Sequence, residues 1–208
     1  MSKVLLINGS PNQNGCITVA LTELARTLEN CGVESETLWL GKKPMQDCVA
    51  CFRCAETGTC VFDDAVNEVG ARIDTIDAIV VGSPVYYSGP NGRLTAFLDR
   101  LFFSVPSQKF AGKLGASVVS CRRGGSTASF ERLNQYFLMN NMTVVGSQYW
   151  NQIHGHSAEE AMQDAEGLQT MRTLGQNMAW LLKAIACADE SGVQRPQYED
   201  HILTNFIR

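Results

Sequence analysis

Four of the eight cysteines in the chain lie close together in the segment QDCVACFRCAETGTCVFDD, at residues 46–64. They are Cys48, Cys51, Cys54 and Cys60, with the spacing C-x2-C-x2-C-x5-C. Three thiolates within one short loop suit a cuboidal iron-sulfur cluster, which commonly takes several ligands from one run of sequence. Zinc sites more often use two C-x2-C pairs that are well separated in the sequence. The spacing therefore favours a [4Fe–4S] cluster over zinc.

Metal-free thiols are the third interpretation of this segment. Asp47, Asp63 and Asp64 would add negative charge beside four thiolates, and that repulsion opposes both kinds of metal site. The sequence leaves a cluster and a metal-free segment as competing hypotheses.

A second group of candidate residues lies in the loop GSPNQNGCIT, at residues 9–18. Gly9 and Gly15 allow tight turns, and a helix that begins here would offer unpaired N–H groups to a phosphate. Ser10, Asn12 and Thr18 add side-chain donors. The loop has neither the Lys of a Walker motif nor the GxGxxG spacing of a dinucleotide fingerprint. Neutral donors of this kind suit a terminal monophosphate, and the competing interpretation is a polar turn without a ligand.

Two further loops have residues that suit a flat heterocycle. In GSPVYYSGPNG, residues 82–92, the prolines and glycines favour an exposed, extended backbone, and Tyr86 or Tyr87 could lie against the face of a ring. In SCRRGGS, residues 120–126, Arg122 or Arg123 could place positive charge where a reduced flavin becomes negative. The alternatives are ordinary loop packing for the tyrosines and a solvated pair for the arginines.

Short apolar runs that alternate with helical patterns must position these loops. The predicted strands cover residues 4–8, 34–40, 78–83, 116–121 and 143–150. The predicted helices cover about 18–30, 64–73, 91–103, 127–140 and 159–187. This alternation predicts an α/β fold, a doubly wound three-layer sandwich around a parallel sheet. Ligands of such sheets bind at the carboxyl ends of the strands, where all three loops lie.

The length, N-terminus and charge of the chain bear on its cellular location and on the partners that it can bind. Its 208 residues suit one domain. The N-terminal stretch MSKVLLINGSP has too few apolar residues for a signal peptide or a membrane span, so we expect a cytoplasmic protein with reduced thiols. The net charge of −4 and the pI near 5.4 disfavour binding to nucleic acid or to a membrane.

The loops make the chain resemble the NADPH-dependent FMN reductase group of the flavodoxin-like superfamily. The resemblance is carried by GSPNQNGCIT, by GSPVYYSGPNGRLTAFLDR and by SCRRGGSTASF. It implies a flavodoxin-like domain over residues 1–187, with a five-stranded parallel sheet of order 2-1-3-4-5. A C-terminal tail, residues 188–208, would pack on the domain or on a partner subunit.

The same resemblance assigns residues to bound FMN. The residues implied around the phosphate are Ser10, Asn12, Cys16, Ile17 and Thr18. Those implied along the isoalloxazine are Pro84, Val85, Tyr86 and Tyr87, with Arg122, Arg123 and Gly124 on its pyrimidine side. The family often has GNT or GNS where this chain has Gly15-Cys16-Ile17, which moves the hydroxyl to Thr18.

The function implied is an FMN-dependent oxidoreductase that takes hydride from NAD(P)H and reduces a quinone, a flavin or another small acceptor. Because no second dinucleotide-binding fold is predicted, both substrates would use one cavity in turn, by a ping-pong mechanism. FMN would carry the chemistry, so no dedicated catalytic residue is predicted.

The cysteine motif also resembles that of iron-sulfur flavoproteins, in which a [4Fe–4S] cluster lies near FMN. The alternative function is therefore an electron carrier with a ferredoxin-like partner, and a third is a flavodoxin-like binding module without turnover.

Three lesser expectations complete the sequence analysis. The start of a helix should lower the pKa of Cys16 and raise its reactivity. His154 and His156 follow the fifth strand, and either could touch a substrate, although a loop that enters the next helix is the commoner explanation for such residues. The last helix is longer than one domain needs, so part of its apolar stripe should pack on another subunit in a homodimer or a dimer of dimers.

Overall fold

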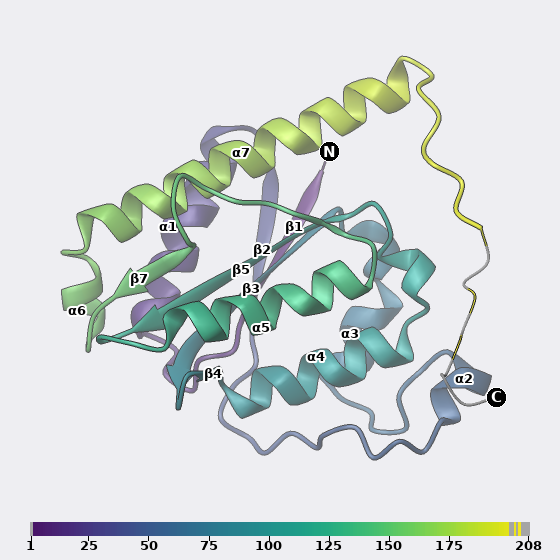
Figure 1. Ribbon diagram of the computed structural model, residues 1–208, viewed down its shortest axis with the longest axis horizontal. Coiled ribbons are helices and arrows are strands. Elements are labelled where there is room, and N and C mark those ends of the chain that lie inside the picture. The colour runs from purple at the N-terminus through teal and green to yellow at the C-terminus, as the bar shows by residue number, and fades with distance from the viewer. Residues whose placement is uncertain (1, 200–201, 203, 205–208) are drawn as a thin grey trace.

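A twisted parallel sheet with helices on both faces forms the centre of the molecule (Figure 1). The structure is a computed structural model, and it describes residues 2–199, 202 and 204. The strands are β1 (Lys3–Asn8), β2 (Glu34–Trp39), β3 (Ala78–Tyr86), β4 (Gly89–Pro90), β5 (Leu114–Cys121), β6 (Thr143–Val144) and β7 (Gln152–His154). Their order is β2-β1-β3-β5-β6, with β7 also on β5 and the short β4 antiparallel to β3. The predicted doubly wound fold is confirmed.

The helices form the two outer layers. They are α1 (Cys16–Asn30), α2 (Arg53–Thr57), α3 (Ala65–Ala71), α4 (Gly92–Ser104), α5 (Ser126–Met139), α6 (Ala158–Ala161) and α7 (Ala165–Glu190), with 3-10 turns at Ile73–Thr75 and Ser107–Lys109. Helices α1 and α7 cover one face of the sheet, and α3, α4 and α5 cover the other (Figure 1). None of the helices in the described part of the chain is long and apolar enough to cross a bilayer.

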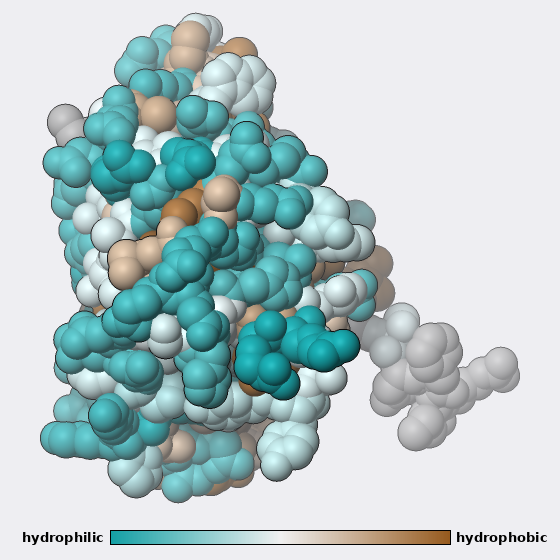
Figure 2. Space-filling model, turned by 90° about the vertical axis from the view of Figure 1, so that its left-hand side faces the viewer, coloured by the Kyte–Doolittle hydropathy of each residue, from teal (hydrophilic) through white to brown (hydrophobic). Residues whose placement is uncertain are grey.

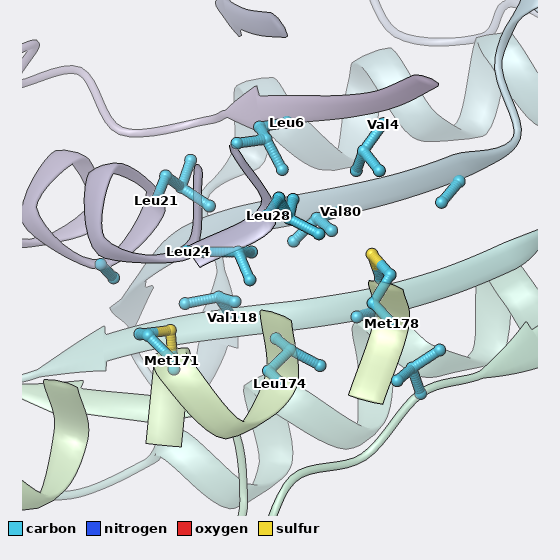
Figure 3. Packing of buried hydrophobic residues seen from close by; sticks show 14 of the residues in the cluster. Val4, Leu6, Leu21, Leu24, Leu28, Val80, Val118, Met171, Leu174 and Met178 are labelled. Atoms are coloured by element: carbon cyan, nitrogen blue, oxygen red, sulfur yellow. The ribbon is translucent and has the colours of Figure 1, made fainter. Parts of the chain in front are cut away.

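Alternate side chains of the strands fill two separate cores. Val4 and Leu6 of β1 point toward α1 and α7, and Leu5 and Ile7 point toward α3, α4 and α5. Figure 3 shows the first core, in which leucines of α1 and the side chains of Met171, Leu174 and Met178 from α7 meet strand valines. Strands that are buried on both faces must be apolar throughout, which explains the continuous apolar runs in the sequence.

Of the predicted fifth strand, residues 143–150, only Thr143–Val144 form a strand, β6, and the next strand, β7, begins after a loop at Gln152. After β6, the hydroxyl of Ser147 lies 2.7 Å from the carbonyl oxygen of Tyr149 and 2.8 Å from the side-chain oxygen of Asn151, within hydrogen-bond distance of both, in a turn that leaves the sheet. The chain rejoins β5 where the N–H of Val119 donates to the carbonyl of Asn151. The polar run from Gly146 to Gln148 therefore interrupts the ladder, so the prediction of one continuous strand was wrong.

The predicted last helix, residues 159–187, is also divided. Asp164 lies between α6 and α7. It caps α7, because its carboxylate accepts from the backbone N–H of Gly167 at 2.9 Å. The same carboxylate accepts from the backbone N–H of His154 at 2.6 Å. The capping residue thus fixes the start of α7 against β7.

Gly175 lies where α7 packs closely on α1, and it offers a test of this packing. A Cβ at position 175 would lie 2.9 Å from Cβ and Cγ2 of Thr27. Alanine gains about 1 kcal/mol in helix propensity over glycine, but overpacking costs about 1–3 kcal/mol. We therefore expect Gly175→Ala to lower the midpoint of urea unfolding. Gly92→Ala in α4 is the control, because no atom lies within 4 Å of its added Cβ; equal stability of the two variants would contradict the close approach.

Candidate functional site: loops at the carboxyl edge and a cysteine cavity

The carboxyl ends of the central strands meet at one edge of the sheet. Asn8 at the end of β1 is in register with Trp39 of β2 and with Gly82 of β3. Further along, Cys121 at the end of β5 pairs with His154 of β7. The three predicted ligand loops all leave the sheet at this edge, on the left of Figure 1. Figure 2 shows that this face is largely hydrophilic, with a small apolar patch near its middle.

The loop between β1 and α1 has the form of an anion site. Helix α1 begins after Gly15 without a side-chain cap, so its first N–H groups have no partner from a capping side chain. Ser10 and Asn12 organise the turn, because the hydroxyl of Ser10 accepts from the N–H of Asn12 at 3.1 Å. The amide of Asn8 accepts from the N–H of Ser10 at 2.9 Å. An uncapped helix start with its positive dipole end suits a phosphate.

Thr18 holds this loop together rather than projecting from it. Its hydroxyl donates to the carbonyl of Gln13 and accepts from the side-chain amide of Asn8. A hydroxyl has one proton, so in this arrangement Thr18 has none left for a phosphate. Ile17 is buried under Gly82. Only the backbone of Ile17 can contribute to an anion site.

Cys16 differs from the sequence expectation. Its sulfur lies 3.5 Å from the carbonyl oxygen of Gly155 and 3.2 Å from that of Ser157, so the single S–H can donate to either. Burial raises the pKa of this thiol, and the negative charge of the nearby Glu160 raises it further. The prediction of a lowered pKa was therefore wrong, because desolvation outweighs the start of the helix. The thiol instead joins the first loop to the segment that follows β7.

The loop after β3 is a tight hairpin with a strained backbone. Tyr86 pairs with Gly89, which leaves Tyr87 and Ser88 as the two turn residues. Both have positive φ, 52° and 61°, a conformation that normally selects Asn or Gly. The side chain of Tyr87 is fully exposed, and that of Tyr86 is half exposed. Such strain is concentrated at functional sites, and here it presents two aromatic rings at the ligand edge.

The loop after β5 packs directly on this hairpin. A Cβ at Gly125, where φ is 87°, would lie 2.9 Å from Cγ1 of Val85 and 2.9 Å from the hydroxyl of Ser88. Beside it, Arg122 and Arg123 are exposed and make no ion pair with the described part of the chain. The second and third predicted loops are therefore in contact, with two unpaired cations at their rim.

Sequence reasoning missed Trp39 as part of this edge. Its indole N–H donates to the carbonyl of Ser10 at 2.8 Å and ties the end of β2 to the first loop. An aromatic residue that ends a predicted strand at the ligand edge was the available signal.

His154 lies within 3.5 Å of the Cys121 thiol, whereas the backbone of His156 donates to Glu160.

The four clustered cysteines lie at a different place in the fold. Cys48, Cys51, Cys54 and Cys60 line one small apolar cavity together with Phe52, Phe62, Phe103 and Arg100. Burial raises the pKa of the Cys54 thiol, and the three neighbouring cysteines add to the shift. Within the described ranges, no group of three or more His, Cys, Asp or Glu side chains is arranged to hold a metal ion. The thiols thus share a cavity without forming a preassembled single-ion site.

Helix α4 separates the two regions. Its capping residue Asn91 adjoins the β3–β4 hairpin, whereas Phe103 near its last turn packs edge-on against Phe52 of the cysteine segment. Twelve residues at ~1.5 Å each place these ends about 18 Å apart. In Figure 1, α2 accordingly lies at the lower right and β4 at the lower left. The resemblance implied a cluster near FMN; within one chain, the β3–β4 hairpin and the cysteine cavity lie at opposite ends of α4.

Comparison with known proteins agrees with the geometry of the carboxyl edge. Residues 2–157 match the family model for NADPH-dependent FMN reductase. The chain belongs to this family. Curated relatives include an iron-sulfur flavoprotein of Methanocaldococcus jannaschii, 30% identical, with coverage of 88% of this chain and 98% of that protein. An iron-sulfur flavoprotein of Methanosarcina thermophila is 27% identical, with coverage of 88% and 96%.

Solved structures support the same fold. RosB with a bound riboflavin 5'-phosphate derivative is similar with a TM-score of 0.70 and 13% identity, over 99% of this chain and 92% of that chain. A flavodoxin from the domain Archaea is similar with a TM-score of 0.58 and 19% identity, over 87% and 99%. This FMN reductase family member therefore has a flavodoxin-like fold, and the family supports FMN as its cofactor.

The hairpin of this family member offers a test in which stability and binding change in opposite directions. Because Asn tolerates positive φ, Tyr87→Asn should raise the free energy of unfolding by about 0.5–1 kcal/mol. The same change should weaken FMN binding, because it removes a ring from the ligand edge. Ser88→Gly is the matched control, since it relieves strain in the same turn without removing a ring. Unchanged FMN affinity in Tyr87→Asn, measured by fluorescence titration, would remove Tyr87 from the site.

Proposed function

We propose that the protein is an FMN-dependent oxidoreductase that oxidises NAD(P)H and reduces a quinone, a flavin or another small acceptor by a ping-pong mechanism. The observation that carries this proposal is the convergence of three loops on one open edge. The backbone N–H of Gly9 in the first loop donates to the carbonyl of Gly82 in the second at 2.9 Å, and the second loop packs on the third at Gly125. Family membership provides independent support for FMN at this edge.

The residues at this edge divide the work of binding FMN. The uncapped start of α1, around Cys16 and Ile17, would hold the phosphate through backbone N–H groups. Ser10, Asn12 and Thr18 would keep that loop in shape, since their polar side-chain atoms already bond within it.

The other two loops would position the ring system. Pro84 and Val85 would border the isoalloxazine beside Tyr86 and Tyr87, and Gly124 would leave room next to it because no atom lies within 4 Å of its added Cβ. Arg122 and Arg123 would supply positive charge on the pyrimidine side. When bound, FMN supplies the redox chemistry, so the chain's residues need only bind it, orient it and balance its charge.

Sequential use of one cavity has a kinetic signature that tests the mechanism. Initial rates at several concentrations of NADPH and of a quinone should give parallel double-reciprocal lines, because the first product must leave before the acceptor enters. Steady-state kinetics with FMN-loaded protein would measure this. Lines that intersect would show that both substrates bind together, and no turnover beyond that of free FMN would argue against an enzyme.

An electron-carrier function is the second candidate, and a separate observation favours it. Four thiols line one cavity, and curated relatives carry the name iron-sulfur flavoprotein. A cluster of four irons is larger than a single ion, so its thiolates need not meet at one point as around zinc. Cys48, Cys51, Cys54 and Cys60 would be its ligands, and a ferredoxin-like protein would be the partner.

Iron content separates the two candidates. Anaerobic protein that carries a [4Fe–4S] cluster should contain about four irons per chain. Cys51→Ser should abolish the cluster's visible absorbance and leave FMN bound, because the flavin loops lie at the other end of α4. Cys187→Ser is the control, since this exposed thiol is on α7, away from the cavity. Protein that is free of iron after reconstitution with iron and sulfide would leave the plain flavin oxidoreductase.

A homodimer or a dimer of dimers completes the proposal. Most of the predicted apolar stripe on α7 is buried within its own chain, as for Met171, Leu174 and Leu182. Trp180 on the same helix is 69% exposed, and an exposed side chain of this size would suit a contact with another subunit on the outer side of α7. Beyond α7, Tyr198 and Ile202 of the tail line a cavity with Met139 at the end of α5. The remaining part of the proposed tail, residues 200–201, 203 and 205–208, lies outside the described residues.

A further inference from the structure

Arg100 of α4 is buried at the side of the cysteine cavity. Its side chain is 1% exposed, and burial of a full charge is costly unless every donor finds an acceptor. A guanidinium has five N–H donors, and here five are engaged. Two donate to the carboxylate of Asp64, at 2.7 and 3.0 Å, in a bidentate pair.

The other three donors all reach the cysteine segment. They donate to the carbonyl of Gln46 at 3.3 Å, to the carbonyl of Phe62 at 2.9 Å and to the sulfur of Cys60 at 3.2 Å. The partners therefore include both ends of the segment 46–64. Asp64 also caps α3, where it accepts from Val66. One side chain thus ties the cysteine segment and the start of α3 to α4.

Few core contacts replace this attachment within the segment itself. Cys48, Cys51 and Phe52 are exposed, and the five-residue α2 has no buried residue. Ala50 and Phe52 have positive φ, 50° and 57°, so the backbone between the first three cysteines is strained. A strained segment with little apolar burial depends on polar contacts for a single conformation. Asn67 of α3 holds its second half, because its side chain accepts from the N–H of Cys60 at 2.9 Å and donates to the carbonyls of Cys60 and Phe62. Arg100 adds the bond to Gln46 at the first end of the segment.

The bond to Cys60 goes beyond what an anchor requires. The bonds of Arg100 to the carbonyls of Gln46 and Phe62 and to Asp64 already hold the segment, yet its Nε–H also donates to the sulfur of Cys60. A hydrogen bond and a nearby cation favour the more negative, reduced state of an iron-sulfur cluster, and bonds to cluster sulfurs are a known determinant of its potential.

We propose that Arg100 is the positioning residue of the cysteine site: it holds the segment 46–64 so that four thiols face one cavity, and through Cys60 it raises the reduction potential of the cluster bound there. The second half rests on the proposed cluster, whereas the first half concerns the chain alone. The two halves therefore need separate measurements.

Trypsin tests the first half in iron-free protein. The exposed Arg53 lies within the segment, and cleavage there reports how often the segment opens. We expect Arg100→Met and Arg100→Lys to speed cleavage at Arg53 by about tenfold or more. Arg93→Met is the matched control, because Arg93 of the same helix also donates to three carbonyls, those of Gly41, Lys42 and Lys43. It should speed cleavage after Lys42 but not after Arg53.

A redox titration tests the second half in anaerobic, cluster-loaded protein. Arg100→Lys retains the charge but not the fork, and Arg100→Met with Asp64→Asn removes the pair without leaving a lone carboxylate. Each variant should lower the reduction potential of the cluster. A tenfold change in the one-electron equilibrium constant would lower it by about 59 mV. Arg93→Met should leave it unchanged. The bound FMN serves as an internal reference, and its potential should not move.

The outcomes distinguish the two proposals. Faster cleavage at Arg53 with an unchanged potential would leave Arg100 as an anchor and overturn the tuning role. Unchanged cleavage at Arg53 in both Arg100 variants, with folding confirmed by circular dichroism, would overturn the positioning role. Wild-type protein that takes up no iron would overturn the tuning role together with the proposed cluster, while the trypsin result would still decide the role of Arg100.

Discussion

The burial of the central strands on both faces is the constraint on which the rest of the structure depends. All eight residues of β5 are buried, and β1 and β3 are buried along most of their length. Parallel strands of this kind need helices on both faces, so every connection must cross over and return to the same edge. That requirement brings the loops after β1, β3 and β5 together, although they are far apart in sequence.

The loops at that edge are held by the chain itself. Trp39 joins the first loop to β2 and Cys16 joins it to the segment after β7, whereas Thr18 bonds within the loop to the carbonyl of Gln13. A site built in this way is organised before a ligand arrives, which reduces the entropy that binding must overcome. The strained turn at Tyr87 and Ser88 is tolerated because β3, β4 and Gly125 enclose it.

The cysteine segment follows a different physical principle. It has little apolar burial and is attached through polar contacts: the ion pair between Asp64 and the buried Arg100, and the hydrogen bonds of Asn67 to Cys60 and Phe62. Hydrogen bonds to a buried charge are stronger than neutral ones, and loss of one partner leaves the other uncompensated. One helix, α4, thus connects the β3–β4 hairpin at its start to a polar anchor near its end.

The alternation of apolar runs and helical patterns in the sequence by itself determined the layers and the three glycine-rich loops at the carboxyl edge, because these are local signals, whereas the strand order came from the resemblance to a known family. It did not determine the break between β6 and β7, where hydrogen bonds of Ser147 outcompete the ladder. Nor could it determine the pKa of Cys16, which depends on burial against residues 155 and 157. Arg100 appeared in the sequence as one charge among apolar helix positions. Only the tertiary structure joined it to Cys60 and Asp64, because contacts between residues 36 and 40 positions apart depend on how the helices pack.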